Sequence, residues 1–201
     1  MSFTSSEVVA ILTGASFAAG LNVYATVATL GLLSRAGALP LPPALHLLNS
    51  WYVIGICAVL FVIEFFADKI PAFDLLWNAL HTFVRVPVAA LLAYGATAQL
   101  SPGAQAAAAG IGGAVALAAH GGKMAVRAAV TPSPEPFSNI GLSLGEDALA
   151  VALTWFATVH PYIAAAIVAF LLLIVVLTVR LVLRALARLF RGARRELAGN
   201  V

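Results

Sequence analysis

The chain has 201 residues, of which 62% are hydrophobic and 9% are charged, and its formal net charge is +3 at neutral pH. Ordinary soluble domains are roughly 45–50% apolar and about 25% charged, so this composition excludes a soluble globular protein and indicates an integral membrane protein. At ~20 residues per helical crossing, the length allows about six spans and leaves no room for a separate soluble domain.

The first predicted span covers residues 7–33, an apolar segment without proline. It contains Asn22 and Tyr24, whose polar groups need partners because lipid offers none at membrane depth. Either neighbouring helices or a solute can supply those partners. A proline-rich connector follows, with a short interfacial helix predicted around residues 45–48.

The second and third predicted spans cover residues 51–68 and 75–98. Glu64 and Asp68 are four residues apart, so they share one face of the second helix. Pro71 has no amide hydrogen and predicts a break between the two helices. The third helix has a polar stripe that must face protein or water, formed by Trp77, Asn78, His81 and Arg85.

Three further spans are predicted at residues 104–129, 140–159 and 162–179. The fourth span ends in a polar face formed by His120, Lys123 and Arg127, because side chains three and four residues apart lie together on a helix. Residues 131–139 contain three prolines and are not expected to form regular helix, so that Ser138 or Asn139 would cap the fifth span. The fifth span carries Glu146 and Asp147.

The C-terminal residues predict the topology. Residues 1–180 form a polytopic transmembrane domain, and residues 181–201 form a basic amphipathic tail that is expected in the cytoplasm by the positive-inside rule. Six spans would then place the N-terminus in the cytoplasm as well. The two halves would run in opposite directions, which is the layout of a three-plus-three inverted repeat.

Ionisable side chains inside a membrane cost ~2.5–3.5 kcal/mol each on insertion scales and mark functional sites or buried ion pairs. We therefore expect a polar centre in which Glu64 and Asp68 bind a cation or a proton, while Lys123 and Arg127 pair with them or with an anionic group. The full set of candidate site residues is Glu64, Asp68, Lys69, Asp74, Arg85, Lys123, Arg127, Glu135, Asn139, Glu146, Asp147, Asn22 and Tyr24.

No enzyme is predicted, because the sequence has no cysteine–histidine pairing, no zinc-protease motif, no nucleophile elbow and no phosphate loop. No cofactor is expected. A divalent-cation site from Glu64 and Asp68 with Glu135 or Glu146 is compatible with the oxygen ligands that hard cations prefer, although the nearby bases weaken it. The arginines of the tail are typical of a topology anchor rather than of a nucleic-acid site.

Three motifs resemble a family of small bacterial integral membrane proteins known as a domain of unknown function. They are residues 20–26 (Gly-Leu-Asn-Val-Tyr-Ala-Thr), residues 64–71 (Glu-Phe-Phe-Ala-Asp-Lys-Ile-Pro), and residues 133–139 (Ser-Pro-Glu-Pro-Phe-Ser-Asn) with the acidic pair 146–147. The resemblance covers nearly the whole chain up to the basic tail. The resemblance implies a location in the bacterial inner membrane, and it implies that these motifs form the polar centre. It implies no particular activity.

Two functions from different classes follow from these patterns. The first is a transporter or channel for a small charged solute, a cation or a proton-coupled one, through a charge-lined cavity. The alternative is a structural or assembly protein whose charges form static buried pairs. A lipid-modifying enzyme would need a nucleophile or a metal site that the sequence lacks. The expected partners are membrane lipid, a small ionic solute and a second copy in a homodimer.

Overall fold

The computed structural model describes residues 4–130 and 136–199, and every regular element within them is helical. For residues 5, 71–75, 129, 136–139, 186 and 189–199 it describes the helical backbone and not the side chain. The predicted all-α fold is confirmed for the described residues. The elements are α1 (Ser5–Leu21), α2 (Val23–Arg35), the 3-10 helix η1 (Pro43–Asn49), α3 (Trp51–Ala67), α4 (Pro71–Ala96), α5 (Pro102–Val130), α6 (Pro136–Val159) and α7 (Pro161–Gly199).

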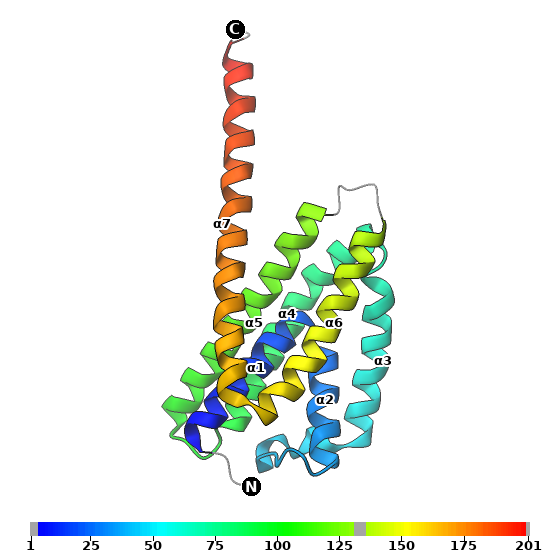
Figure 1. The fold of residues 1–201 in the computed structure, drawn as a ribbon, viewed down its shortest axis with the longest axis vertical. Helices are drawn as coiled ribbons and strands as arrows, with labels where there is room; N and C mark the ends of the chain where they lie inside the picture. Colours follow the sequence, from blue (N-terminus) through cyan, green and yellow to red (C-terminus); the bar gives the residue numbers. More distant parts are fainter. Residues whose placement is uncertain (1–3, 131–135, 200–201) are drawn as a thin grey trace.

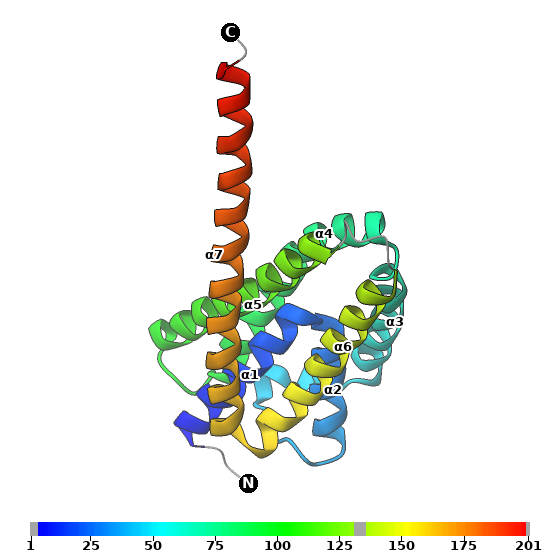
Figure 2. The ribbon, with the colours of Figure 1, turned by 45° about the horizontal axis from the view of Figure 1, so that its top comes forward.

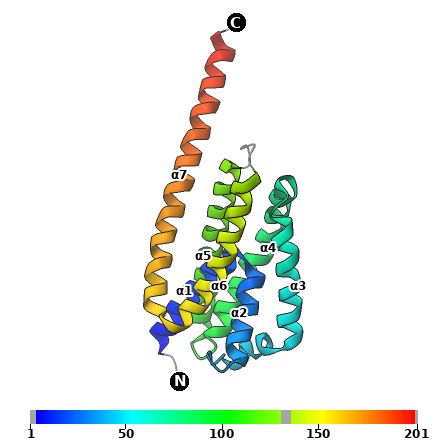
Figure 3. The same ribbon diagram turned by 45° about the vertical axis from the view of Figure 1, so that its right-hand side comes forward.

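The first two helices form a hairpin. α1 runs from one end of the bundle to its middle, and α2 returns to the end from which α1 started (Figure 1, Figure 3). Val8 and Ile11 near the start of α1 accordingly line the same apolar cleft as Leu30 near the end of α2. The continuous helix predicted for residues 7–33 is therefore wrong, because the chain turns back at Asn22.

Fewer helices than predicted qualify as membrane spans. Among the described residues, four helices are long and apolar enough to cross a membrane, namely Leu76–Ala96, Pro102–Ala128, Ile140–Val159 and Pro161–Ala185. A fifth span results if η1 and α3, which are bent by 61° relative to each other, count as one. Neither the six spans nor the inverted repeat is confirmed. The first predicted span is a hairpin, whereas its expected counterpart α5 is one continuous helix.

Prolines set several boundaries. Pro71 and Pro136 each occupy the first residue of a helix, where the missing amide hydrogen costs no intrahelical bond. The predicted break before α4 is therefore confirmed. The expectation that residues 136–139 are non-helical, with Ser138 or Asn139 as the cap, is wrong because α6 starts earlier than that.

Small residues bring α1 against its neighbours. A Cβ atom added to Gly14 would lie 2.6 Å from the Cβ atom of Ala157, and one added to Gly20 would lie 2.7 Å from that of Ala119. Close backbone approach through such residues is a common way for membrane helices to pack. α1 therefore sits at the centre of the bundle, where it contacts α4, α5, α6 and α7.

The last helix extends beyond the others. α7 begins beside the start of α1, where the hydroxyl groups of Ser6 and Tyr162 lie 3.0 Å apart, and it continues past the rest of the bundle (Figure 2). Its apolar part ends near Ala185, and the helix then carries the basic tail as far as Gly199. The first and last helices therefore have their free ends at opposite ends of the molecule (Figure 1).

Candidate functional site

The site is built around Asn22, the residue at the tip of the hairpin. Its backbone is extended (φ −150°, ψ 103°), and its amide N–H donates to the Ala18 carbonyl as the last bond of α1. Its side-chain Oδ1 accepts from the Ala25 amide at 2.9 Å, so the same residue caps the start of α2. The Nδ2 group donates to Asp147 Oδ1 on α6 at 2.9 Å. One fully buried asparagine therefore ends one helix, starts the next and contacts an acid.

Two cations face the C-terminal end of α1. Arg85 Nη1 donates to the Gly20 carbonyl at 3.2 Å, and Lys123 Nζ donates to the Leu21 carbonyl at 3.4 Å. The last carbonyls of a helix have no intrahelical partner and carry partial negative charge. The end of α1 at the hairpin turn is therefore stabilised by one cation from α4 and one from α5.

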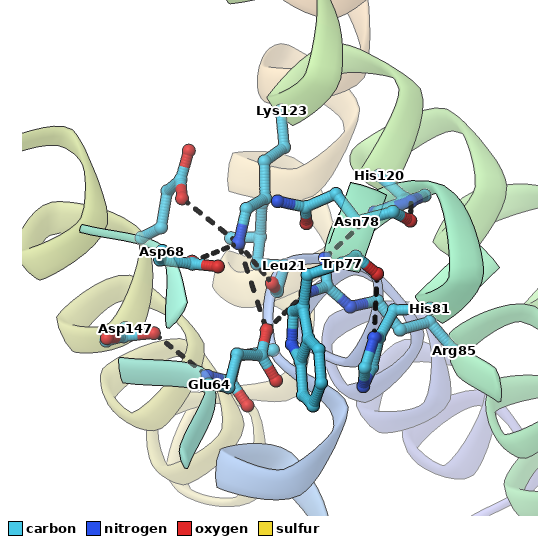
Figure 4. A network of polar contacts seen from close by, with 12 residues as sticks. Leu21, Glu64, Asp68, Trp77, Asn78, His81, Arg85, His120, Lys123 and Asp147 are labelled. Carbon is cyan, nitrogen blue, oxygen red and sulfur yellow. Dashed lines mark hydrogen bonds and ion pairs between the residues drawn. The ribbon is translucent and has the colours of Figure 1, made fainter. Parts of the chain in front are cut away.

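The same two cations hold the acids of α3. Arg85 Nη2 forms an ion pair with Glu64 Oε1, and both residues are completely buried. Lys123 Nζ lies 2.8 Å from Asp68 Oδ2 and 3.9 Å from Glu64 Oε1. Figure 4 shows the lysine ammonium directed toward both carboxylates and the Leu21 carbonyl. Glu64 and Asp68 thus point together, as predicted, toward a cation of α4 and a cation of α5.

A third cation closes the network on the α6 side. Arg127 Nη2 lies 3.1 Å from Asp68 Oδ2 and 2.6 Å from Glu146 Oε2. Lys123 also lies 3.2 Å from Glu146 Oε2. Glu146 is the most exposed member, with 12% of its side chain accessible. Arg127 and Asp68 are each 1% exposed. The network therefore lies inside the bundle, with one edge near its surface.

The charges of this ion-paired network balance. Among the described residues, three carboxylates pair with three fixed cations: Glu64, Asp68 and Glu146 with Arg85, Lys123 and Arg127. Buried ions are costly unless they are paired and hydrogen-bonded. Such balance explains how a bundle with so few charges can keep these buried.

Arg85 also orients a histidine. Its Nη1 group lies 2.8 Å from His120 Nδ1, and a guanidinium can only donate, so Nδ1 must accept. The ring proton then resides on Nε2, which lies 2.9 Å from both the Asn78 carbonyl and Thr82 Oγ1. The network therefore continues from α3 through Arg85 to α5 and back to α4.

Tyr24 lies beside the network and not in it. Its hydroxyl group is 3.0 Å from His81 Nε2, while His81 Nδ1 is 2.8 Å from the Trp77 carbonyl, to which it must donate. Tyr24 also lines an apolar cleft of about 490 Å³ between η1, α2, α3 and α4. This cleft and the ionic network occupy different places, and in this conformation the charges are packed against one another.

Asp147 differs from the other acids. It is 6% exposed, and the one hydrogen bond to its carboxyl group among the described residues comes from the Asn22 side-chain amide to Oδ1. Its Oδ2 atom is buried without a hydrogen-bond partner among the described residues, as are Glu64 Oε2 and Asp68 Oδ1. Unlike those two acids, Asp147 has no cation of the described chain within ion-pair distance. In the described part of the chain, a buried acid next to the ionic network therefore remains without a counter-charge.

The structure brings eight of the predicted site residues together: Asn22, Glu64, Asp68, Arg85, Lys123, Arg127, Glu146 and Asp147. Lys69 takes a different place, because its Nζ donates to the Phe65 carbonyl at 2.7 Å and lies over the Phe65 ring. Glu135 and the side chains of Asp74 and Asn139 lie outside the described residues. No group of three metal-ligating side chains occurs in the described part of the chain.

Sequence reasoning did not assign His120 or the two helix-end carbonyls to the site. His120 lies three residues before Lys123 on the same helical face, and this spacing was the available signal. The carbonyls of Gly20 and Leu21 gave no signal, because they become accessible only where α1 ends.

The fold and site define a class: a multi-pass helical membrane protein with a broken helical hairpin whose tip contacts a buried ionic network. The chain belongs to the family described as Domain of unknown function (DUF4126), whose model matches residues 9–181. That match covers the hairpin except for the first four residues of α1, the ionic network and most of the apolar part of α7. No curated protein and no solved structure matches the chain.

Proposed function

We propose that this protein is a proton-coupled transporter or channel for a small charged solute. The observation that carries this proposal is the α1–α2 hairpin, which ends inside the bundle against buried charges. In several transporter folds, interrupted helices turn their free ends toward the substrate and the coupling ion. Here the C-terminal end of α1 faces Arg85 and Lys123, and the start of α2 lies beside Asp147.

The solute would bind by exchanging with internal partners. A cation would compete with Lys123 for the oxygens of Asp68 and Glu64, and an anion would compete with these acids for Lys123. Either event needs the ion-paired network to open, because its charges are paired with one another in this conformation. The described conformation would therefore be an occluded resting state.

We further propose a location in the cytoplasmic membrane with the arginine-rich tail in the cytoplasm, as the positive-inside rule predicts. The hairpin adds no crossing, and the free ends of α1 and α7 lie at opposite ends of the molecule. The N-terminus would then lie outside, which replaces the expectation that both termini are cytoplasmic. With Cys57 replaced by alanine, a membrane-impermeant thiol reagent should label Ser6→Cys and a cysteine appended to the C-terminus from opposite sides. Labelling from one side would restore the six-span topology.

The proposed activity is transport and not catalysis, and the proposed working unit is a homodimer. A small bundle often needs a second copy to enclose a path through the membrane. Mass measurement by light scattering in detergent tests the dimer, and a monomeric mass would remove it.

The alternative is a static role for the ion pairs, and their charge balance favours it. The two functions differ in their demands on a double variant. Glu64→Gln with Arg85→Gln removes one pair without leaving a net charge, so a static role predicts near-normal behaviour of the protein. Transport predicts that the double variant folds and loses flux. A charge exchange is less suitable, because a carboxylate at position 85 would face the Gly20 carbonyl.

The test is flux in proteoliposomes. Purified protein is reconstituted with a pH-sensitive dye inside, and small cations and anions are added outside one at a time. We expect one solute class to drive proton movement in the wild type, and no movement in the double variant. A protein that is folded in vesicles but moves no proton with any solute would contradict transport and favour the static role.

A further inference from the structure

The buried acids fall into two groups. Glu64, Asp68 and Glu146 each lie within ion-pair distance of a fixed cation. Asp147 follows Glu146 directly in α6, yet among the described residues it accepts one hydrogen bond, from an uncharged amide. The sequence does not distinguish these neighbours. Only the packing shows that one of these four acids has no counter-charge among the described residues.

An isolated buried carboxylate is unfavourable because it loses its hydration and gains no charge partner, and such groups generally neutralise by taking up a proton. Among the described residues, the three fixed cations of the network are already matched in number by Glu64, Asp68 and Glu146. An ionised Asp147 would add a fourth negative charge to a balanced network. A protonated Asp147 leaves that network neutral.

We propose that Asp147 is the proton-binding site of this protein and carries a proton in the described conformation. The bound proton resides on the carboxyl group, which keeps Oδ1 as the acceptor for Asn22 Nδ2. Oδ2 is the second oxygen and has no hydrogen-bond partner among the described residues. Proton release breaks one O–H bond and transfers the proton to water, and uptake reverses this step.

The surroundings also allow the ionised form to exist. Asp147 sits beside the start of α2, where the first amides give partial positive charge that favours a nearby anion. The charged groups close enough to influence it electrostatically are Lys123 of α5, Asp68 at the end of α3, Glu146 of α6, and Glu64 and Lys69 on either side of Asp68. Lys123 is the cation among them that also holds the hairpin tip through Leu21.

Proton occupancy therefore acts on the hairpin through two contacts. Asn22 connects Asp147 to the cap of α2, and Lys123 connects the acid network to the end of α1. A negative charge at Asp147 attracts Lys123, which then has to share its ammonium between Asp147, Asp68 and the Leu21 carbonyl. The link between this proton and solute movement rests on the proposed function, whereas the bound proton itself does not.

Infrared spectroscopy on the purified full chain near neutral pH tests the bound proton. Wild-type protein should show the C=O stretch of a protonated carboxylic acid, with the shift expected on exchange into heavy water. Asp147→Asn should lose this band, while Glu146→Gln, a substitution of the adjacent paired acid, should keep it. Absence of the band in the wild type, or its persistence in Asp147→Asn, would overturn the proposal.

Stability provides a second readout that does not depend on spectral assignment. Asparagine has the shape of a protonated aspartic acid and preserves the acceptor for Asn22, so Asp147→Asn should unfold at nearly the wild-type denaturant concentration. Asp68→Asn removes a paired charge and should unfold at a clearly lower one. Equal destabilisation of both variants would mean that Asp147 is ionised in the wild type.

Flux separates this proposal from the proposed function. If the wild type transports, Asp147→Asn should reduce proton movement at least tenfold while remaining folded. If the wild type does not transport, the proposed function fails and the infrared result still decides whether Asp147 holds a proton.

Discussion

Removing one partner of the Glu64–Arg85 pair is the sharpest perturbation of the ionic network. Glu64→Gln preserves the shape of the side chain and takes away the one carboxylate that lies against Arg85, which is completely buried. Arg85 keeps the Gly20 carbonyl and His120 Nδ1 as neutral acceptors. It has no second carboxylate within ion-pair distance among the described residues.

The expected loss is large. Leaving one member of a buried ion pair without its partner costs about 3–5 kcal/mol, and a glutamine oxygen that still accepts a hydrogen bond recovers ~1 kcal/mol. We therefore expect the free energy of unfolding to fall by about 3 kcal/mol. Glu146→Gln is the matched control, because its side chain is 12% exposed and both of its cations keep Asp68. It should cost roughly 1 kcal/mol, as expected for a partly exposed pair.

Denaturant titration in detergent micelles, followed by tryptophan fluorescence and circular dichroism, measures both losses. Coincident transitions by the two probes are needed for the two-state treatment. The double variant Glu64→Gln with Arg85→Gln should recover most of the stability lost by Glu64→Gln alone. A Glu64→Gln protein within about 0.5 kcal/mol of wild type, or a double variant less stable than either single variant, would refute the buried pair.

Three further outcomes are expected at the hairpin and its surroundings. Gly20→Ala should destabilise the protein by about 1–3 kcal/mol, because the added methyl group overpacks against α5. Its control is Gly121→Ala, where nothing lies within 4 Å of the added Cβ atom. In the same denaturant titration this control should be neutral or slightly stabilising. Asn22→Ala removes the cap of α2 and the amide donor to Asp147, so it should lower the free energy of unfolding by about 2 kcal/mol or more. Amide hydrogen exchange at the start of α2 should become faster, and unchanged exchange would contradict the cap. Nitrogen NMR of labelled histidine should place the ring proton of His120 on Nε2 in the wild type, and a proton on Nδ1 would contradict its contact with a guanidinium.

Much of the helical layout was predictable because a helix in lipid must satisfy its own backbone hydrogen bonds, which makes apolar length a strong signal. The predicted spans 75–98 and 104–129 correspond to α4 (Pro71–Ala96) and α5 (Pro102–Val130) within a few residues. The polar stripe through Arg85 was also predictable, since three- and four-residue spacing alone determines which side chains share a face.

The hairpin was not predictable from the same rules. Residues 7–33 contain no proline and read as one apolar helix. Helix propensity and hydropathy are local, whereas the groups that stabilise the break come from distant helices: Arg85 and Lys123 on the free carbonyls of α1, and Asp147 on the Asn22 side chain. Asn22 was a local hint, because asparagine is a favoured helix cap, but a cap in the middle of an apolar segment needs tertiary partners.

The sequence by itself indicated a lipid environment, the lengths of most helices and the few charged residues that form the buried network. Tertiary structure alone decided how those charges are matched. Glu146 and Asp147 are adjacent and chemically alike, yet one contacts two cations and the other contacts an amide. Successive residues on a helix point about 100° apart, so packing assigns each side chain to different neighbours, and those neighbours determine which acid is paired.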